Sequence, residues 1–211
     1  VVSGKYKIDE ILIDLRHLSS KAGVSFVKAE IKGIELKKKK LLLVGRPEIE
    51  YSSLSLNIGT KTNFNSQSSI GTDRNLAIPI KPFFEALKFI IDQDIYKYDS
   101  SAIPFVVIGD GFAGIEIACS LSERWPKRSI LLKIKQGRKL KKNVLRTLNS
   151  LNIEIIRNNP SSLYPKLICT GNKSFEWIKN SGLPIDLNGR VLTRKTLQVL
   201  NYPELFAVGD C

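Results

Sequence analysis

Three glycines, Gly109, Gly111 and Gly114, form an unbroken G-x-G-x-x-G pattern in the middle of the chain. The pattern follows the apolar run FVVI and precedes a stretch typical of a helix, which is the context in which it binds a dinucleotide. The first glycine would permit a tight turn, the second would let a pyrophosphate approach the backbone, and the third would allow close helix-to-strand packing. The N–H groups at the start of the helix would face the pyrophosphate. A glycine-rich turn without a ligand is the alternative interpretation.

Basic residues follow the next apolar strand, at the position that selects between the two nicotinamide nucleotides. An acid there accepts a hydrogen bond from the ribose 2′-OH of NAD, whereas basic residues accommodate the extra phosphate of NADP. The strand ends in LLKIKQGRK, with Lys133, Lys135 and Arg138 and no acidic residue. The sequence therefore favours NADP(H) over NAD(H), with solvated surface lysines as the competing explanation.

Alternating strands and helices are expected to position these residues. The pattern predicts strands at 105–108, 129–134 and 153–156, separated by helices at 112–125 and 140–151. This order is typical of a parallel sheet with right-handed crossovers. We therefore expect residues 101–168 to form a nucleotide-binding domain.

The segments on either side are expected to form a second, discontinuous domain from residues 1–79 and 169–211, joined to the first through a connecting helix within 80–100. The sequence predicts a short helix or turn at 8–18, strands at 24–30, 31–36, 41–45 and 49–59, a hairpin tip at 37–40, a polar loop at 60–75, and short strands in 163–171, 181–193 and 204–210. The pair Asn188-Gly189 is typical of a tight turn.

The composition is that of a globular protein with an excess of basic residues: 43% of residues are hydrophobic and the formal net charge is +13. No apolar run is long enough for a membrane span or a signal sequence. Three widely spaced cysteines argue against a disulfide framework and for the cytoplasm. The basic residues lack interleaved aromatic ones, which argues against a nucleic-acid partner. Neither the cysteines nor the single histidine, His17, have metal-site spacing. Because the chain contains no methionine and stops directly after LFAVGDC, we expect a fragment.

Four stretches carry a resemblance to a known family. They are GDGFAGIE at 109–116, YSSLSLNIG at 51–59, LICTG at 167–171 and GRVLTRKTLQVLNYPELFAVGDC at 189–211. Together they resemble the pyridine nucleotide-disulfide oxidoreductase superfamily, whose members are flavoproteins with two dinucleotide-binding domains. The resemblance implies an α/β protein with two Rossmann-like, three-layer domains, in which an incomplete NAD(P)-binding domain is inserted in the FAD-binding domain.

The resemblance also implies cofactor contacts beyond the glycine loop. Glu116 follows that loop in the NAD(P) motif, and Gly59 and Gly171 end two strands that lead between the domains. Gly209 would let the backbone approach the linker of the flavin, and Asp210 would accept a hydrogen bond from a ribityl hydroxyl. The implied cofactors are FAD together with NADP or NAD.

A narrower resemblance concerns IDLRHLSSKAGVSF and AIPIKP, which are most similar to the NADH-dehydrogenase-like flavoprotein found with selenophosphate synthetase. It implies an FAD-dependent oxidoreductase that passes hydride from NAD(P)H to flavin and on to an unidentified acceptor, a quinone or small molecule. Selenophosphate synthetase would be a partner, and the protein would be cytoplasmic or peripheral to a membrane. The family's first FAD glycine motif and the segment that follows GDC are absent from this sequence.

Two other functions fit the same residues. A sulfide:quinone-type flavoprotein would use no nicotinamide, and Cys169, which replaces the alanine usual in the family, would carry sulfur. A nucleotide-sensing or partner-binding module would bind a dinucleotide without turnover. In the oxidoreductase interpretation the cofactor does the chemistry, so no catalytic acid or base is expected among these residues.

Overall fold

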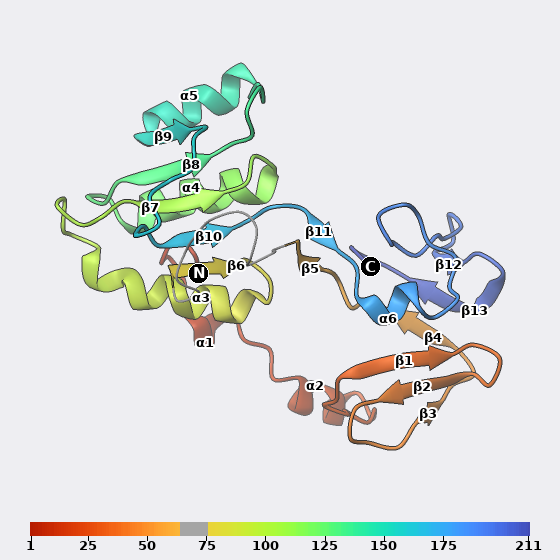
Figure 1. Cartoon of the computed structure of the whole chain (residues 1–211). Helices are drawn as coiled ribbons and strands as arrows, with labels where there is room; N and C mark the ends of the chain where they lie inside the picture. The colour runs from red at the N-terminus through yellow and green to blue at the C-terminus, as the bar shows by residue number, and fades with distance from the viewer. Residues whose placement is uncertain (64–75) are drawn as a thin grey trace. The chain divides into compact units, whose positions relative to one another are not determined.

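The computed structural model describes residues 1–63 and 76–211 (Figure 1). Its helices are α1 (Ile8–Ile11), α2 (Leu15–Lys21), α3 (Phe83–Asp92), the 3-10 helix η2 (Gln93–Tyr96), α4 (Phe112–Arg124), α5 (Lys142–Ser150) and α6 (Glu176–Lys179). Its strands are β1 (Ile31–Glu35), β2 (Lys40–Leu43), β3 (Ile49–Glu50), β4 (Leu54–Leu56), β5 (Lys61–Thr62), β6 (Ala77–Pro79), β7 (Phe105–Ile108), β8 (Ile130–Lys133), β9 (Ile153–Ile156), β10 (Lys166–Ile168), β11 (Asn172–Lys173), β12 (Gln198–Val199) and β13 (Tyr202–Ala207). Most of the polar loop expected at 60–75 lies outside the described residues.

The chain divides into two compact units. Unit 1 consists of Val1–Leu12 and Thr62–Gly171, and unit 2 consists of Ile13–Lys61 and Asn172–Cys211. The compact units divide the chain at other residues than the expected domains do, because residues 1–12, 62–79 and 169–171 belong to the unit that contains the glycine loop; the expected domains themselves stay a prediction. The helix expected within 80–100 is present as α3 and η2, and it is part of unit 1. Which nucleotide each unit binds stays a prediction.

Unit 1 is built on a parallel sheet with the strand order β6-β10-β7-β8-β9. Its strand β7 has the sequence FVVI, and all four residues are buried. A continuous apolar run of this kind is expected of a central parallel strand covered on both faces. The predicted alternation of strand and helix over 105–156 is confirmed by β7, α4, β8, α5 and β9.

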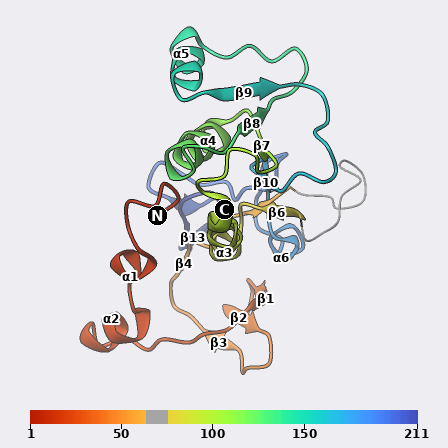
Figure 2. The same cartoon turned by 90° about the vertical axis from the view of Figure 1, so that its left-hand side faces the viewer.

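The helices α3, α4 and α5 pack on one face of this sheet. The buried residues of this core are Ala86, Ile90, Phe105, Val107, Ala118, Leu121, Trp125, Ile130, Ile134, Leu132, Leu148, Ile153 and Leu167. Figure 2 shows α4 and α5 on the same side of β7, β8 and β9. Alternate residues of the strands, including Val106 and Leu131, form a separate buried cluster, because successive side chains of a strand point to opposite faces.

Unit 2 contains an antiparallel sheet, β1-β2-β3, and a sheet with the order β12-β13-β4, in which β13 runs parallel to β4. The hairpin between β1 and β2 turns within the predicted lysine run, where Lys39 has a φ of 52°. The predicted turn at Asn188-Gly189 is also confirmed, since the Gly189 N–H donates to the Asp186 carbonyl at 2.9 Å.

Several predicted strands differ from the structure. Residues 24–30 form no strand, so that prediction is wrong: Val24 and Phe26 are 58% and 41% exposed, and the described residues give this segment no ladder partner. The strand expected over 49–59 is two short strands, β3 and β4, and 181–193 contains only isolated bridges. Two short helices, α1 and α2, stand where one was expected at 8–18. Alternating apolar residues indicate a strand only when a neighbouring strand completes the hydrogen bonds.

Candidate functional site

The glycine loop joins the carboxyl end of β7 to the start of α4. Gly109 donates its N–H to the Lys133 carbonyl of β8 at 3.1 Å, which fixes the loop against the next strand. Its φ is +147°, and a Cβ there would lie 2.5 Å from the Cys169 carbonyl oxygen. A Cβ on Gly114 would lie 2.1 Å from the Gly109 carbonyl oxygen. Backbone atoms therefore occupy the space that a side chain would need at either glycine.

Gly111, the middle glycine, differs from the other two because a side chain there would meet no protein atom. It is exposed, its φ and ψ are −84° and 176°, and a Cβ there would meet no protein atom within 4 Å. Any residue can adopt this backbone conformation, so the fold itself does not require glycine here. An absent side chain at an open loop position is what close approach of a pyrophosphate to the backbone requires.

Helix α4 begins directly after Gly111 and runs for 13 residues. Its first turn contains no acidic residue, so no side chain of that turn opposes the partial positive charge of the helix N-terminus. Glu116 lies exposed in the second turn, outside the loop itself. The loop and the helix start thus combine the features that favour a bound anion, while the role of Glu116 stays a prediction.

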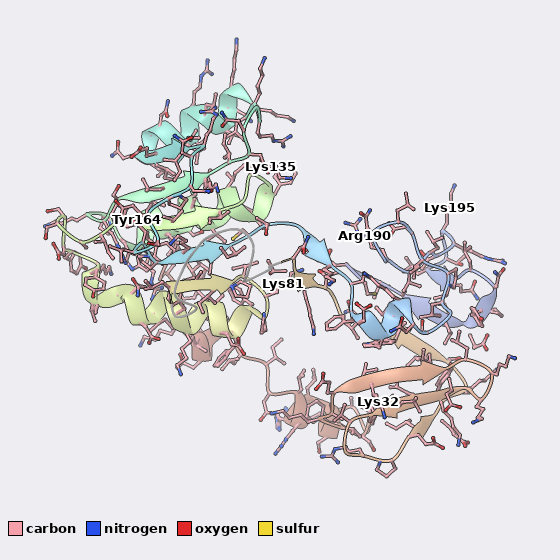
Figure 3. All side chains as sticks on the ribbon, viewed as in Figure 1. Lys32, Lys81, Lys135, Tyr164, Arg190 and Lys195 are labelled. Carbon is pink, nitrogen blue, oxygen red and sulfur yellow. The ribbon has the colours of Figure 1, made fainter. Side chains whose placement is uncertain are left out.

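The three basic residues predicted to select the nucleotide do not form one cluster. Lys133, the last residue of β8, donates its Nζ to Asn159 Oδ1. Lys135 lies just beyond the end of β8 (Figure 3), and the Arg138 N–H donates to its carbonyl at 3.1 Å. The structure therefore brings Lys135 and Arg138 together in one turn and binds Lys133 to a different neighbour.

Asp110, between the first two glycines, is a residue that the sequence analysis did not single out. Its Oδ2 accepts from the Lys135 backbone N–H at 3.2 Å and lies 4.0 Å from Arg138 Nε. The Asp110 side chain is 18% exposed. The signal that could have identified it is an acid inside the glycine pattern, G-D-G, because this position lies beside the end of the second strand.

The residues predicted to contact flavin lie in both units. In unit 2, Gly59 and Gly209 follow the parallel strands β4 and β13, and so lie at the same edge of their sheet. Gly59 has a φ of +64°, and a Cβ added to it would lie more than 4 Å from any protein atom other than those of its chain neighbours. Gly209 has a φ of +78°, and a Cβ added to it would lie 2.9 Å from Asn57 Oδ1. Asp210 is exposed after β13. Gly171 belongs to unit 1, where its carbonyl accepts from Asn63 N–H at 2.8 Å.

The cysteines are reduced and part-buried or buried. Cys169 follows β10, and its N–H donates to the Ile108 carbonyl of β7 at 2.7 Å. Burial raises the pKa of the Cys169 thiol to about 12, and burial also raises the pKa of Cys119. No group of side chains in the described residues could hold a metal ion.

Cys169 should react slowly with alkylating reagents in the folded protein. At pH 8 a thiol of pKa about 12 is almost wholly protonated, and the thiolate is the reactive form. We expect alkylation by iodoacetamide to be at least roughly a hundredfold slower than in the denatured protein. Mass spectrometry of a peptide containing Cys169, followed over time with and without denaturant, measures this. Equal rates in the two states would show that the thiol is accessible and that its pKa is not raised by the fold.

No protein-family profile matches the sequence, but individual proteins do. The chain is 22% identical over 223 residues to ferroptosis suppressor protein 1 of Xenopus tropicalis, covering 89% of this chain and 57% of that protein. It is 22% identical over 272 residues to the alternative NAD(P)H-ubiquinone oxidoreductase C1, chloroplastic/mitochondrial, of Arabidopsis thaliana, covering 100% of this chain and 51% of that protein. The chain thus spans about half the length of these curated relatives.

Solved structures show the same fold. The NAD-dependent persulfide reductase of A. fulgidus aligns with a TM-score of 0.79 and 18% identity, covering 100% of this chain and 44% of that one. The chain therefore has the Rossmann-like, two-domain architecture of the FAD- and NAD(P)-binding oxidoreductases, and it is similar to flavoproteins of the pyridine nucleotide-disulfide oxidoreductase type. Within the described ranges, no helix has the length and apolar character needed to cross a membrane.

Proposed function

We propose that this chain is part of an FAD-dependent oxidoreductase in which NAD(P)H binds at the glycine loop and reduces flavin, which then reduces a separate acceptor. The observation that carries the proposal is the contrast within the loop. Gly109 and Gly114 are held by backbone contacts, whereas Gly111 faces open space at the start of a long helix. A turn that served the fold alone would not need glycine at position 111.

The chain's own residues would bind and orient the nucleotide. The N–H groups at the start of α4 would donate to the pyrophosphate, and Gly111 would let it approach the backbone. These interactions require no proton transfer from a side chain. The protein's contribution is therefore position and electrostatics.

The sheet edge of unit 2 fits the flavin part of the proposal. Gly59 and Gly209 end parallel strands at one edge, and ligands of open α/β sheets bind outside the carboxyl ends of the strands. Asp210 would accept from a ribityl hydroxyl there, and the open side of Gly59 would leave room for the cofactor. When bound, FAD would accept hydride from the nicotinamide and pass electrons to the acceptor.

The relatives support this class of reaction. The name of the Arabidopsis relative describes an NAD(P)H-ubiquinone oxidoreductase, and that of the A. fulgidus structure an NAD-dependent reductase. We propose an acceptor that is a quinone or a small molecule. The narrower resemblance to the flavoprotein found with selenophosphate synthetase, and a cytoplasmic or membrane-peripheral location, belong to the same proposal and rest on the motifs quoted above.

The test is an anaerobic titration of the protein that contains this chain. The purified protein, supplied with FAD, should show the flavin absorbance band, and NADH or NADPH should bleach it. A protein that stays colourless with FAD present would contradict the flavin part of the proposal. A flavin band that neither nucleotide bleaches would favour the sensing module or the sulfide:quinone-type alternative.

The sulfide:quinone-type alternative makes a different demand on Cys169. A sulfur carrier must react as a thiolate, and the raised pKa of Cys169 keeps its thiol protonated near neutral pH. This argues for a packing role beneath the glycine loop. Under the proposed function, Cys169→Ser should leave reduction of the flavin by the nucleotide unchanged, whereas loss of sulfide-dependent flavin reduction would support the alternative.

A further inference from the structure

The carboxylate of Asp110 lies beside the end of the second strand, which is where folds of this type distinguish NAD from NADP. The ribose 2′-OH of NAD is bound by an acid at the end of the second strand of the fold. Here that strand is β8, which ends at Lys133 without an acid. The Asp110 side chain nevertheless reaches this strand end from the glycine loop, because its Oδ2 accepts from Lys135 N–H at 3.2 Å.

The contacts of Asp110 fix the carboxylate and leave an acceptor. Both described contacts, with Lys135 N–H and with Arg138 Nε, involve Oδ2. Oδ1 has no hydrogen bond to the protein within residues 1–63 and 76–211. At 18% exposure the side chain is largely shielded, yet part of it remains accessible. A carboxylate accepts up to about four hydrogen bonds, so Oδ1 can accept from a ribose hydroxyl.

Lys133 and Arg138 already have partners in the protein and are therefore poorly placed to bind the 2′-phosphate of NADP. Lys133 donates to Asn159, and Arg138 lies near the Asp110 carboxylate. A phosphate placed here would therefore face a fixed negative charge and would compete with it for the guanidinium. The repulsion between two negative charges is strongest where solvent is partly excluded, because the effective dielectric constant is lower there. Only the exposed Lys135 side chain remains without a described carboxylate or amide partner.

We propose that Asp110 accepts a hydrogen bond from the ribose 2′-OH and that it makes NADH, not NADPH, the preferred nucleotide. This inference rests on the proposed binding of a dinucleotide at the glycine loop. It assigns to the loop the carboxylate that other such folds place at the strand end. It also reverses the preference that the basic residues of LLKIKQGRK suggest when the sequence is read alone.

The experiment compares two ligands that cannot undergo redox chemistry: ADP-ribose and its 2′-phosphate. Their affinities for the intact protein would be measured by calorimetry. We expect ADP-ribose to bind at least about tenfold more tightly, because a hydrogen bond to a charged acceptor contributes about this much and the phosphate is repelled. Asp110→Asn keeps an oxygen that can accept from Lys135 N–H but removes the charge, and should lower this preference by roughly tenfold.

Two further variants separate this inference from general charge effects. Glu154→Gln removes an exposed carboxylate from the neighbouring strand β9 and should leave the preference unchanged. Arg138→Ala should leave the affinity for the 2′-phosphate within about threefold; a loss of about tenfold or more would place the phosphate on Arg138 and overturn the inference.

The outcomes also distinguish the inference from the proposed function. Tighter binding of the 2′-phosphate by the unaltered protein, or an unchanged preference in Asp110→Asn, would overturn the inference while dinucleotide binding stood. Binding of neither ligand would overturn the proposed function and the inference with it.

Discussion

One methyl group added at Gly111 should weaken dinucleotide binding by roughly 10- to 100-fold, the range expected for overpacking a close contact, and should leave the fold intact. The Cβ of Gly111→Ala would enter open space in the free protein, where no protein atom lies within 4 Å. Its backbone conformation suits alanine, and alanine in place of glycine at this N-cap position costs about 1 kcal/mol or less, which is small beside the stability of a folded domain. The methyl group would occupy the space through which a pyrophosphate reaches the backbone.

The same methyl group at Gly109 should have the opposite principal effect. In Gly109→Ala the new Cβ would lie 2.5 Å from the Cys169 carbonyl oxygen, which is part of the backbone, and the φ of +147° would be strained. Strain and overpacking each cost about 1–3 kcal/mol. We therefore expect unit 1 to be destabilised by about 2–5 kcal/mol, with binding lost as a consequence of the displaced loop.

The pair is tested by measuring thermal unfolding and the affinity for ADP-ribose on each variant. Gly33→Ala is the control, because its Cβ would make an ordinary 3.8 Å contact with Leu42 in unit 2. It should change neither property of unit 1. Normal binding by Gly111→Ala would show that no ligand approaches the backbone at this position, and that result would remove the main support for the proposed function.

The sequence predicted the glycine loop and its flanking elements well because their signals are local. FVVI is long enough to indicate a buried strand, and the spacing of Gly109, Gly111 and Gly114 carries the turn, the opening and the helix packing together. Local sequence patterns could not predict the order of the strands in the sheet, because that order depends on pairing between distant segments. Strand β6 pairs with β10 at a separation of 89 positions in the sequence, as Ala77 with Lys166, so its three residues are defined by a distant partner. This is why the expected domain boundary at 79 differs from that of unit 1.

The contacts of two polar side chains, Lys166 and Asp110, could also not be predicted from the sequence. Lys166 lies in β10 and is fully buried, with its Nζ donating to the Ser162 and Tyr164 carbonyls at 3.1 and 2.7 Å. Burial lowers the pKa of this lysine. From sequence alone a lysine is expected to be exposed to solvent. The carbonyl acceptors of Lys166 come from the path of the preceding turn, which the sequence does not reveal. Asp110 likewise becomes informative only when Lys135 is seen to donate to it.

Replacing Asp94 with alanine should destabilise unit 1 by about 2–4 kcal/mol, as expected when a partly buried ion pair loses one partner. Asp94 lies in η2 and accepts three hydrogen bonds from the end of α4. Arg124 Nε and Nη2 donate to Oδ1 and Oδ2 at 2.7 and 2.5 Å, and Trp125 Nε1 donates to Oδ1 at 2.8 Å. The bidentate geometry makes these bonds stronger than those of an ordinary surface pair.

The partners that remain explain most of this expected loss. The Arg124 side chain is only 11% exposed, and in Asp94→Ala its charge would keep only the Val1 and Val2 carbonyls as described acceptors. The indole N–H of the buried Trp125 would lose its acceptor as well. Because the Asp94 side chain is 34% exposed, water can replace part of what is lost, which holds the expected effect below that of a fully buried pair.

The pH dependence of this effect identifies its electrostatic origin. Burial alone would raise the pKa of Asp94, but the hydrogen bonds from Arg124 and Trp125 and the Arg124 charge outweigh it, so the pKa is lowered from 3.8. A lowered carboxyl pKa contributes stability above the pKa of the unfolded state, and this contribution is lost as pH falls through the folded-state pKa. The difference between the unaltered protein and Asp94→Ala should therefore stay constant from about pH 7 to 5 and shrink below about pH 4.

Denaturant unfolding at several pH values measures this difference, and Asp92→Ala provides the matched control. Asp92 is an exposed carboxylate at the end of α3, two residues before Asp94, and its removal should change the free energy of unfolding by less than about 0.5 kcal/mol. A destabilisation by Asp94→Ala that persisted unchanged to pH 3 would assign it to packing. If Asp92→Ala matched Asp94→Ala at neutral pH, the loss would belong to the general charge of this segment and not to the contacts that join η2 to α4.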